Sequence, residues 1–318
     1  MTESEHNPLK TQVLMIGGPT ATGKSALGVA LAKRFNGEVV NGDAFQIYRD
    51  MTIGTAKVTP AEMQGVPHHL IDILAPSAPF SAARFQTLAQ AAIKDITARG
   101  KLPIVVGGTG FYLSALRLGL PLGGEAATPA RQRWQTALAA HDAAWLWAQL
   151  HRLDPAAAAA IPPANTRRVI RALEVSETSG QLFSAQQTPA PQYDDLVIGL
   201  TADRATLYHR IDQRVLQIVA AGLEAEVRRV VEETSPGAQA LKAIGYKEWL
   251  PYFAGQASRE ATIALIQQNS RHYAKRQLTY FRHQLPTHWL DLVADPAAGL
   301  AAAVTLVAKW RRAGAAQK

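Results

Sequence analysis

The sequence predicts an α/β protein in which a parallel sheet is flanked by helices and interrupted by an all-α insertion domain. Three observations support this fold class. Short apolar runs alternate with amphipathic stretches over the first 120 residues. No convincing strand follows over residues 121–192, and an apolar run then returns at Asp194–Thr201 (DDLVIGLT). We therefore expect an α/β core formed by residues 1–120 and 193–318, with a helical C-terminal part, and a helical insertion domain at 121–192.

The apolar runs have the character of strands that are buried on both faces of a parallel sheet. Such runs occur at Gln12–Gly17, Glu38–Val40 and Leu102–Val106. Helical apolar spacing marks the segments Lys24–Phe35 and Ala82–Arg99 between them. Strands that alternate with helices in this way indicate parallel pairing with helices on both faces of the sheet.

Helical patterns account for most of the remaining chain. Within the insertion they include a run of five alanines at 156–160, which is compatible with a helix. The predicted helices are Arg131–Ala140, Ala143–Leu153 and Thr166–Ser179 in the insertion, and Arg204–Ala221, Leu223–Glu233 and Thr262–His283 after the last strand.

Composition limits the classes of function. The 318 residues are 47% hydrophobic and 18% charged, as in a soluble globular protein, and contain no cysteine. Disulfides, thiolate metal sites and a cysteine nucleophile are therefore excluded.

Residues 1–10 lack the features of a signal peptide, and the apolar stretch Ala297–Ala308 is shorter than the ~20 residues of a membrane helix. We expect a cytoplasmic protein without a membrane segment. Its formal charge of +8 favours phosphate-rich partners such as nucleic acid.

A glycine-rich loop follows the first predicted strand and opens the first predicted helix. It matches the pattern G-x-x-x-x-G-K-[ST] and predicts a P-loop NTPase-like core. Backbone N–H groups of such a loop surround phosphate oxygens, the lysine adds a point charge, and the last hydroxyl can bind Mg²⁺. The pattern does not identify the phosphate compound. The loop consists of Gly18, Pro19, Thr20, Ala21, Thr22, Gly23, Lys24 and Ser25.

Two polar residues follow other predicted strands, and the topology places both at the same edge of the sheet as the loop. Asp43 follows Glu38–Val40, where a carboxylate could act as a general base or cap a helix. Thr109 follows Leu102–Val106 within the segment GGTG. Its hydroxyl could bond a phosphate or orient a nucleophile, or the segment could be a simple glycine turn.

The adjacent residues His68 and His69 are candidate metal ligands. Neighbouring side chains of an extended segment point to opposite faces, so the pair is poorly placed for joint ligation. We expect a structural role for both histidines.

Basic residues are concentrated in two helical segments. Arg167, Arg168 and Arg171 lie on or near one helical face. Residues 261–290 contain no acidic residue, yet they hold several lysines and arginines with interleaved aromatics. This combination is typical of a surface that follows an RNA backbone and stacks exposed bases. The alternative is a solvated helix whose aromatics face the core.

Taken together, the motifs resemble the tRNA dimethylallyltransferases (tRNA isopentenyltransferases) of the bacterial type. They occur in the family's order across almost the whole chain. The matching segments are GPTATGKS at 18–25, DAFQIYRDMTIGTAK at 43–57, VPHHLID at 66–72, VGGTGFYL at 106–113, NTRRVIRALEV at 165–175, GLEAEV at 222–227, IGYKE at 244–248 and AKRQLTYFR at 274–282.

The resemblance implies an activity and a set of site residues. The family transfers a dimethylallyl group from dimethylallyl diphosphate to N6 of adenosine at position 37 of tRNA, beside the anticodon. By resemblance, Asp43 is the general base, Thr109 lies near the reacting centre, and Arg214 helps to hold the leaving diphosphate. The glycine-rich loop would cradle that diphosphate, with Mg²⁺ near Ser25.

The resemblance also implies contacts with the tRNA anticodon stem-loop, and we expect a monomeric enzyme. The family usually has serine where this chain has Ala44, so any contact made by that hydroxyl is missing here. A cysteine-based zinc module, which eukaryotic relatives often add, is not expected. The implied RNA contacts are Asp43, Ala44, Phe45, Gln46, Arg131, Arg167, Arg168, Arg171, Lys242, Gly245, Tyr246, Lys247, Lys275, Arg276, Gln277, Tyr280 and Arg282.

Two other classes share the loop and the parallel sheet. The first is a small-molecule kinase that uses ATP. The second is an ATP-driven RNA-binding protein without transferase chemistry. The basic surfaces and later motifs argue against the kinase, and the segment Val105–Gly108 lacks the strand-end acid that an ATPase uses for magnesium.

Overall fold

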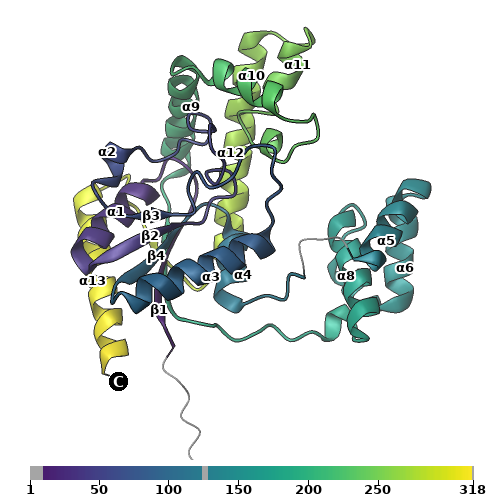
Figure 1. The fold of residues 1–318 in the computed structure, drawn as a ribbon, viewed down its shortest axis with the longest axis horizontal. Helices are drawn as coiled ribbons and strands as arrows, with labels where there is room; N and C mark the ends of the chain where they lie inside the picture. Colours follow the sequence, from purple (N-terminus) through teal and green to yellow (C-terminus); the bar gives the residue numbers. More distant parts are fainter. Residues whose placement is uncertain (1–9, 124–127, 317–318) are drawn as a thin grey trace, which may run out of the picture. The chain divides into compact units, whose positions relative to one another are not determined.

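The structure, a computed structural model, describes residues 10–123 and 128–316. It confirms the α/β fold class. A six-stranded sheet has the order β3-β2-β4-β1-β5-β6, and every neighbouring pair is parallel (Figure 1). The strands are β1 (Gln12–Gly17), β2 (Gly37–Asn41), β3 (His68–His69), β4 (Leu102–Val106), β5 (Asp194–Leu200) and β6 (Thr287–Leu290).

The chain divides into two compact units, one of residues 1–121 with 191–318 and one of residues 122–190. The first unit contains the sheet. Its helices are α1 (Lys24–Phe35), α2 (Pro60–Met63), α3 (Ala82–Ala98), α4 (Gly110–Leu118), α9 (Arg204–Ala220), α10 (Leu223–Glu233), α11 (Trp249–Phe253), α12 (Arg259–Gln284) and α13 (Pro296–Ala315).

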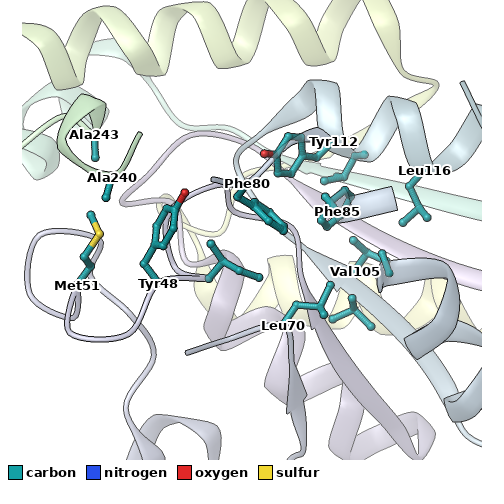
Figure 2. Close-up of a cluster of buried hydrophobic side chains, with 14 of the residues drawn as sticks. Tyr48, Met51, Leu70, Phe80, Phe85, Val105, Tyr112, Leu116, Ala240 and Ala243 are labelled. Atoms are coloured by element: carbon teal, nitrogen blue, oxygen red, sulfur yellow. The ribbon is translucent and has the colours of Figure 1, made fainter. Parts of the chain in front are cut away.

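Side chains of the central strand β1 alternate between two apolar clusters, as expected for a strand that is covered on both faces. Val13 and Met15 belong to the larger cluster, with residues of α3, α4, α9, α10 and α12. Leu14 and Ile16 belong to the other cluster, with residues of α1 and α13. Figure 2 shows part of the larger cluster, in which the ring of Phe85 stacks on Tyr112.

The second unit is helical and has a small core of its own. Leu146, Leu150, Val169 and Leu173 are almost completely buried there. Side-chain oxygens cap the N-termini of its helices. The hydroxyl oxygen of Thr128, for example, accepts a hydrogen bond from the backbone N–H of Arg131. The helices of this unit are α5 (Pro129–Ala140), α6 (Ala143–Leu153), α7 (Pro155–Ala160) and α8 (Thr166–Ser179).

Most predicted elements are confirmed within a few residues of their expected ends. The structure adds β3, β6, α2, α4, α11 and α13, which the periodicity did not predict. Among the described residues, no helix combines the length and the apolar character that a membrane crossing requires.

Candidate active site

The glycine-rich loop joins the end of β1 to the start of α1. Its backbone adopts positive φ angles at Gly18 (132°), Ala21 (66°) and Gly23 (91°). A Cβ atom on Gly18 would lie 2.5 Å from the carbonyl oxygen of Leu200, so the position requires glycine. No side chain caps the N-terminus of α1. Its first N–H groups are therefore available to an anion, which the helix dipole also favours.

Polar side chains hold the loop in this shape. The hydroxyl of Thr22 donates to the carbonyl oxygen of Pro19 at 2.8 Å, and Nζ of Lys24 donates to the same oxygen at 2.6 Å. Ser25 follows at the start of α1 and lines the adjoining cavity with Thr20. These bonds give the loop the shape of a cradle for a phosphate.

Two cationic side chains, Lys24 and Arg214, line the cavity at this loop. Burial and the nearby charge of Arg214 lower the pKa of Lys24 to about 8, and the charge of Asp43 partly opposes both effects. Burial likewise lowers the pKa of Arg214, against the opposing charges of Glu62 and Asp43. Two neighbouring cations that are removed from water favour an anion between them. The electrostatics of the cradle therefore suit a phosphate or diphosphate.

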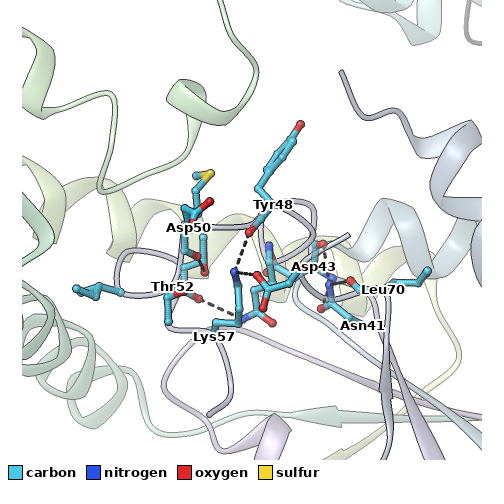
Figure 3. Close-up of polar contacts among 12 residues, drawn as sticks. Asn41, Asp43, Tyr48, Asp50, Thr52, Lys57 and Leu70 are labelled. Atoms are coloured by element: carbon cyan, nitrogen blue, oxygen red, sulfur yellow. Dashed lines mark hydrogen bonds and ion pairs between the residues drawn. The ribbon is translucent and has the colours of Figure 1, made fainter. Parts of the chain in front are cut away.

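Asp43 lies just beyond the carboxyl end of β2. Its Oδ1 accepts hydrogen bonds from the backbone N–H groups of Phe45 (2.9 Å) and Gln46 (3.3 Å). Asn41 supports the turn, because its Oδ1 accepts from the backbone N–H of Asp43 and its Nδ2 donates to the carbonyl of Leu70 at 2.9 Å (Figure 3). No helix begins here, so Asp43 caps a turn and not a helix. Both of these hydrogen bonds, from the N–H groups of Phe45 and Gln46, are accepted by the same oxygen, Oδ1.

Thr109 connects the turn at Asp43 to the end of β4. Its Oγ1 accepts a hydrogen bond from the backbone N–H of Ala44 at 3.3 Å. The N–H of Gly42 also donates to the carbonyl of Val106 at 2.8 Å. The structure thus places Asp43, Thr109 and the glycine-rich loop at one edge of the sheet, where ligands of α/β proteins bind.

Two adjoining cavities open at this edge. The first, which we call the loop cavity, has a volume of about 400 Å³ and is lined by the glycine-rich loop, Gln46 and Gln277. The second, the apolar cavity, has a volume of about 300 Å³. Its walls include Phe45, Ile211, Val215, Ile218, Ile244 and Ile266, together with the cationic side chains of Lys242, Lys247 and Arg276. Both cavities are lined by Thr20, Asp43, Thr55, Ala56, Arg214 and Tyr273.

The predicted RNA contacts fall into different environments. Lys275, Arg276 and Arg282 are exposed on α12, and Arg167 and Arg168 are exposed on α8. Arg131 and Arg171 instead form ion pairs with the buried carboxylate of Glu174, at 2.8 Å and 3.0 Å.

Tyr246 was predicted to contact RNA, but its side chain is completely buried. Its hydroxyl donates to Glu226, so the structure assigns it to packing and not to an exposed surface. Gly245 is also buried, and Gln277 is 6% exposed at the wall of the loop cavity. Tyr280 is partly buried. The RNA contacts predicted from motifs therefore mix surface residues with supporting ones.

His68 and His69 occupy the edge strand β3. Nε2 of His69 lies 2.7 Å from Oε2 of the buried Glu38, and Nδ1 of His68 lies 2.8 Å from the carbonyl oxygen of Val66. These contacts support the structural role expected for the pair. No cluster of three or more possible metal-binding side chains occurs within the described part of the chain.

Sequence reasoning missed some residues that shape the cavities. Tyr273 lines both of them, although the sequence marked it only as one of several interleaved aromatics. The pKa of Tyr273 is raised to about 12, mainly because its phenol is buried and also because of the charge of Asp43. Hydrogen bonding to Thr109 acts in the opposite direction. Thr55 and Ala56 also line both cavities, within a segment that was recognised only as part of a longer motif.

The fold and site define a P-loop-like α/β protein whose ligand site lies at the carboxyl edge of a parallel sheet. Comparison with known proteins gives the family. The IPP transferase family model matches residues 46–284. A tRNA dimethylallyltransferase of Lacticaseibacillus casei is 60% identical over 300 residues, which cover 94% of this chain and 97% of that protein. The chain therefore belongs to the IPP transferase family.

Solved structures agree with this assignment. The crystal structure of a tRNA isopentenylpyrophosphate transferase from Bacillus halodurans matches with a TM-score of 0.76 and 42% identity, over 97% of this chain and 99% of that one. A eukaryotic dimethylallyltransferase acting on tRNA matches with a TM-score of 0.74 and 30% identity, over 88% of this chain and 74% of that one.

Proposed function

We propose that this chain transfers a dimethylallyl group from dimethylallyl diphosphate to N6 of adenosine 37 in tRNA. One observation carries the proposal: the loop cavity, which is lined by the glycine-rich loop, and the apolar cavity with its cationic walls share the carboxylate of Asp43. Two substrates of different chemistry can therefore meet at one acid. A small-molecule kinase would share the loop cavity, but its chemistry gives no reason for the cationic apolar cavity or for the relatives described above.

The loop cavity suits the leaving diphosphate. Breaking the allylic carbon–oxygen bond places negative charge on the diphosphate, and groups aimed at that charge lower the barrier. The N–H groups at the start of α1, Nζ of Lys24 and the guanidinium of Arg214 are such groups. Their mutual repulsion before binding is relieved when the anion enters between them.

The apolar cavity suits the adenine base. A base that undergoes chemistry must leave its stack and enter a pocket, where apolar walls can cover its faces. Lys242, Lys247 and Arg276 contribute to the wall of this cavity and can neutralise phosphates of the RNA backbone. Apolar walls also keep water away from the cation-like carbon that forms as the diphosphate departs.

Asp43 stands between the two substrates as the general base. The C–O bond to diphosphate breaks, a C–N bond forms to N6, and the carboxylate of Asp43 takes the proton that the amine loses. The turn hydrogen bonds from Phe45 and Gln46 fix Oδ1, so we assign the proton to Oδ2. Thr109 positions this turn through the N–H of Ala44.

Magnesium would be held mainly by the substrate. The residues present fit this arrangement, since the hydroxyl of Ser25 lines the loop cavity while Val106, Gly107 and Gly108, at the end of β4, bring no carboxylate to it. Mg²⁺ often keeps few protein ligands and binds through phosphate oxygens and water. When bound beside Ser25, the ion would add positive charge next to the diphosphate.

The exposed arginines of α8 and the cations of α12 are each suited to the backbone of an anticodon stem-loop. We propose that both units contribute to tRNA binding, the insertion through Arg167 and Arg168. We also propose that the enzyme acts as a monomer in the cytoplasm.

One assay tests the proposal. The protein is incubated with dimethylallyl diphosphate labelled in the prenyl group and with an anticodon stem-loop that contains adenosine 37, with and without ATP. We expect label on the RNA in the absence of ATP, and none on a stem-loop with guanosine at that position. ATP hydrolysis or a phosphorylated product, with no label on RNA, would contradict the transferase and support the ATP-dependent alternatives.

A further inference from the structure

Glu226 is a buried carboxylate with four hydrogen-bond donors. It lies on α10 and is 4% exposed. Its Oε2 accepts from the backbone N–H groups of Thr52 (2.9 Å) and Ile53 (2.8 Å), and its Oε1 accepts from the N–H of Gly54 (2.9 Å). The hydroxyl of Tyr246 completes the set at 2.5 Å from Oε1. Three consecutive N–H groups thus converge on one side chain, whose two carboxylate oxygens can accept all of them.

The three N–H groups belong to the segment that enters the active site. Thr55 and Ala56 follow directly, and both line the loop cavity and the apolar cavity. Their carbonyl oxygens lie within reach of the side-chain amide of Gln46, whose Nε2 donates to the oxygen of Thr55 at 3.1 Å. The backbone segment 52–56 is therefore hydrogen-bonded to Glu226 at its start and to Gln46, at the wall of the loop cavity, at its end.

The segment is held in a conformation that it would not keep without support. Ala56 has a φ of 46°, which is unusual for a residue with a Cβ atom. A Cβ atom on Gly54 would come within 2.5 Å of the ring of Tyr246, so the backbone is seated tightly against that ring. The backbone N–H of Lys57 donates to the carbonyl of Thr52 and closes the loop (Figure 3).

Tyr246 acts as a donor throughout the working pH range. Burial and the neighbouring charge of Glu226 both raise the pKa of its phenol. Its ring belongs to the main apolar core, which fixes the hydroxyl in place. The carboxylate of Glu226 is thus bound by the hydroxyl of Tyr246, whose ring is anchored in the apolar core. In turn it binds the backbone N–H groups of residues 52–54.

We propose that Glu226 is a positioning residue of the transfer reaction, which clamps residues 52–54 so that Thr55, Ala56 and Gln46 form the wall shared by the two substrate cavities. This inference rests on the proposed function. Glu226 lines neither cavity in the structure and touches no substrate; it acts through the backbone that it holds.

The test compares two buried carboxylates that differ in what they hold. Glu226→Gln keeps the shape of the side chain but directs an NH₂ group at backbone donors, so at least one clamp bond is lost. Glu38→Gln is the matched control. Glu38 is 1% exposed and pairs with Arg99, Lys101 and His69, none of which lines the loop cavity or the apolar cavity. Both variants lose buried interactions, but only Glu226→Gln releases the cavity wall.

The kinetic readout is kcat with both substrates saturating, per folded molecule, with the folded fraction taken from circular dichroism. We expect a loss of about 10²-fold for Glu226→Gln, the scale of a misplaced site, with the dissociation constant for RNA close to that of the wild type. Glu38→Gln should keep its kcat per folded molecule. Tyr246→Phe removes one donor only and should give a smaller loss than Glu226→Gln.

Amide hydrogen exchange supplies a readout that does not depend on activity. The peptide that spans residues 51–57 should exchange faster in Glu226→Gln than in the wild type, while peptides of β1 and β4 do not change. Equal kcat per folded molecule in Glu226→Gln and Glu38→Gln, or unchanged exchange at 51–57, would overturn the inference alone. Absence of transfer by the wild-type protein would instead overturn the proposed function.

Discussion

The side-chain amide of Gln277 donates from Nε2 to the carbonyl oxygen of Gly108 at 2.8 Å. The contact fastens α12 to the turn after β4, 169 residues earlier in the chain. It also fixes the orientation of the amide, and Oε1 then has no hydrogen-bond partner of ordinary geometry among the described residues. Gln277 also lines the loop cavity, so the contact ties the wall of that cavity to the end of β4.

Replacing Gln277 by leucine should destabilise the protein. The carbonyl of Gly108 would lose its side-chain donor and keep only the N–H of Gly110 at 3.1 Å, and loss of a buried hydrogen bond costs about 1 kcal/mol. The free energy of unfolding, measured by urea titration, checks this expectation. Thr279→Ala is the control, because Thr279 is exposed on the same helix and its hydroxyl bonds only within the helix. Equal stability of Gln277→Leu and Thr279→Ala would show that the link contributes little.

The depressed pKa of Lys24 predicts a pH dependence of stability. With a folded pKa of about 8 against the ordinary lysine value of 10.5, the folded state binds fewer protons than the unfolded state between these two values. Stability should therefore rise with pH across that window, because the unfolded state binds more protons there. Lys24→Met should remove this part of the rise.

Ligand binding gives a second view of the same lysine. An anion in the cradle favours the charged form of Lys24, so the protein should take up protons when dimethylallyl diphosphate binds near pH 8.5. Calorimetry in two buffers of different ionisation enthalpy measures that uptake, with Lys24→Met as the control. Proton uptake of the same size in Lys24→Met would show that another group is responsible.

The variant Asp43→Asn separates the role of Asp43 as a general base from its role as a hydrogen-bond acceptor in the turn. An asparagine Oδ1 can still accept from the N–H groups of Phe45 and Gln46, so the local backbone is kept. Turnover should fall by roughly 10²–10⁴, as for a lost general base, while RNA affinity stays near that of the wild type. Asp43→Ala should lose the turn bonds as well. If Asp43→Asn retains full turnover and only Asp43→Ala is impaired, the residue is a turn cap and not a base.

The fold and the site differ in how far the sequence predicts them. β1, α1 and β4 have local signals, since each is a continuous apolar run or an amphipathic stretch of ordinary length. β6 has only four residues, none of them fully buried, and exists because it pairs with β5. Such an edge strand has no period of its own to detect.

The same distinction holds at the active site. The glycine-rich loop is set by spacing within eight residues, and Asp43 is found because strand ends meet at one edge. The clamp at Glu226 joins residues 172 to 174 positions apart, so no local pattern announces it. The burial of Tyr246 illustrates a related limit: a motif shows that a residue belongs to a family pattern, but not whether its side chain is buried.

Arg276 should contribute to RNA binding through charge. Its side chain is exposed on α12, lines the apolar cavity, and lies with Cζ 5.6 Å from the centre of the Tyr273 ring, which supports the guanidinium. Removing one phosphate contact should weaken RNA binding and reduce the slope of log K against log salt by about 1. Binding of an anticodon stem-loop to Arg276→Ala, titrated at several salt concentrations, measures both effects.

Arg312→Ala is the matched control for this experiment. Arg312 is exposed on α13, a helix that packs against the other apolar cluster, and it lines neither cavity. It carries the same charge, so it reports the effect of net charge alone. We expect its salt slope to match that of the wild type. If the two variants shift affinity and slope equally, Arg276 acts through the overall charge of the protein and makes no specific contact with the RNA backbone.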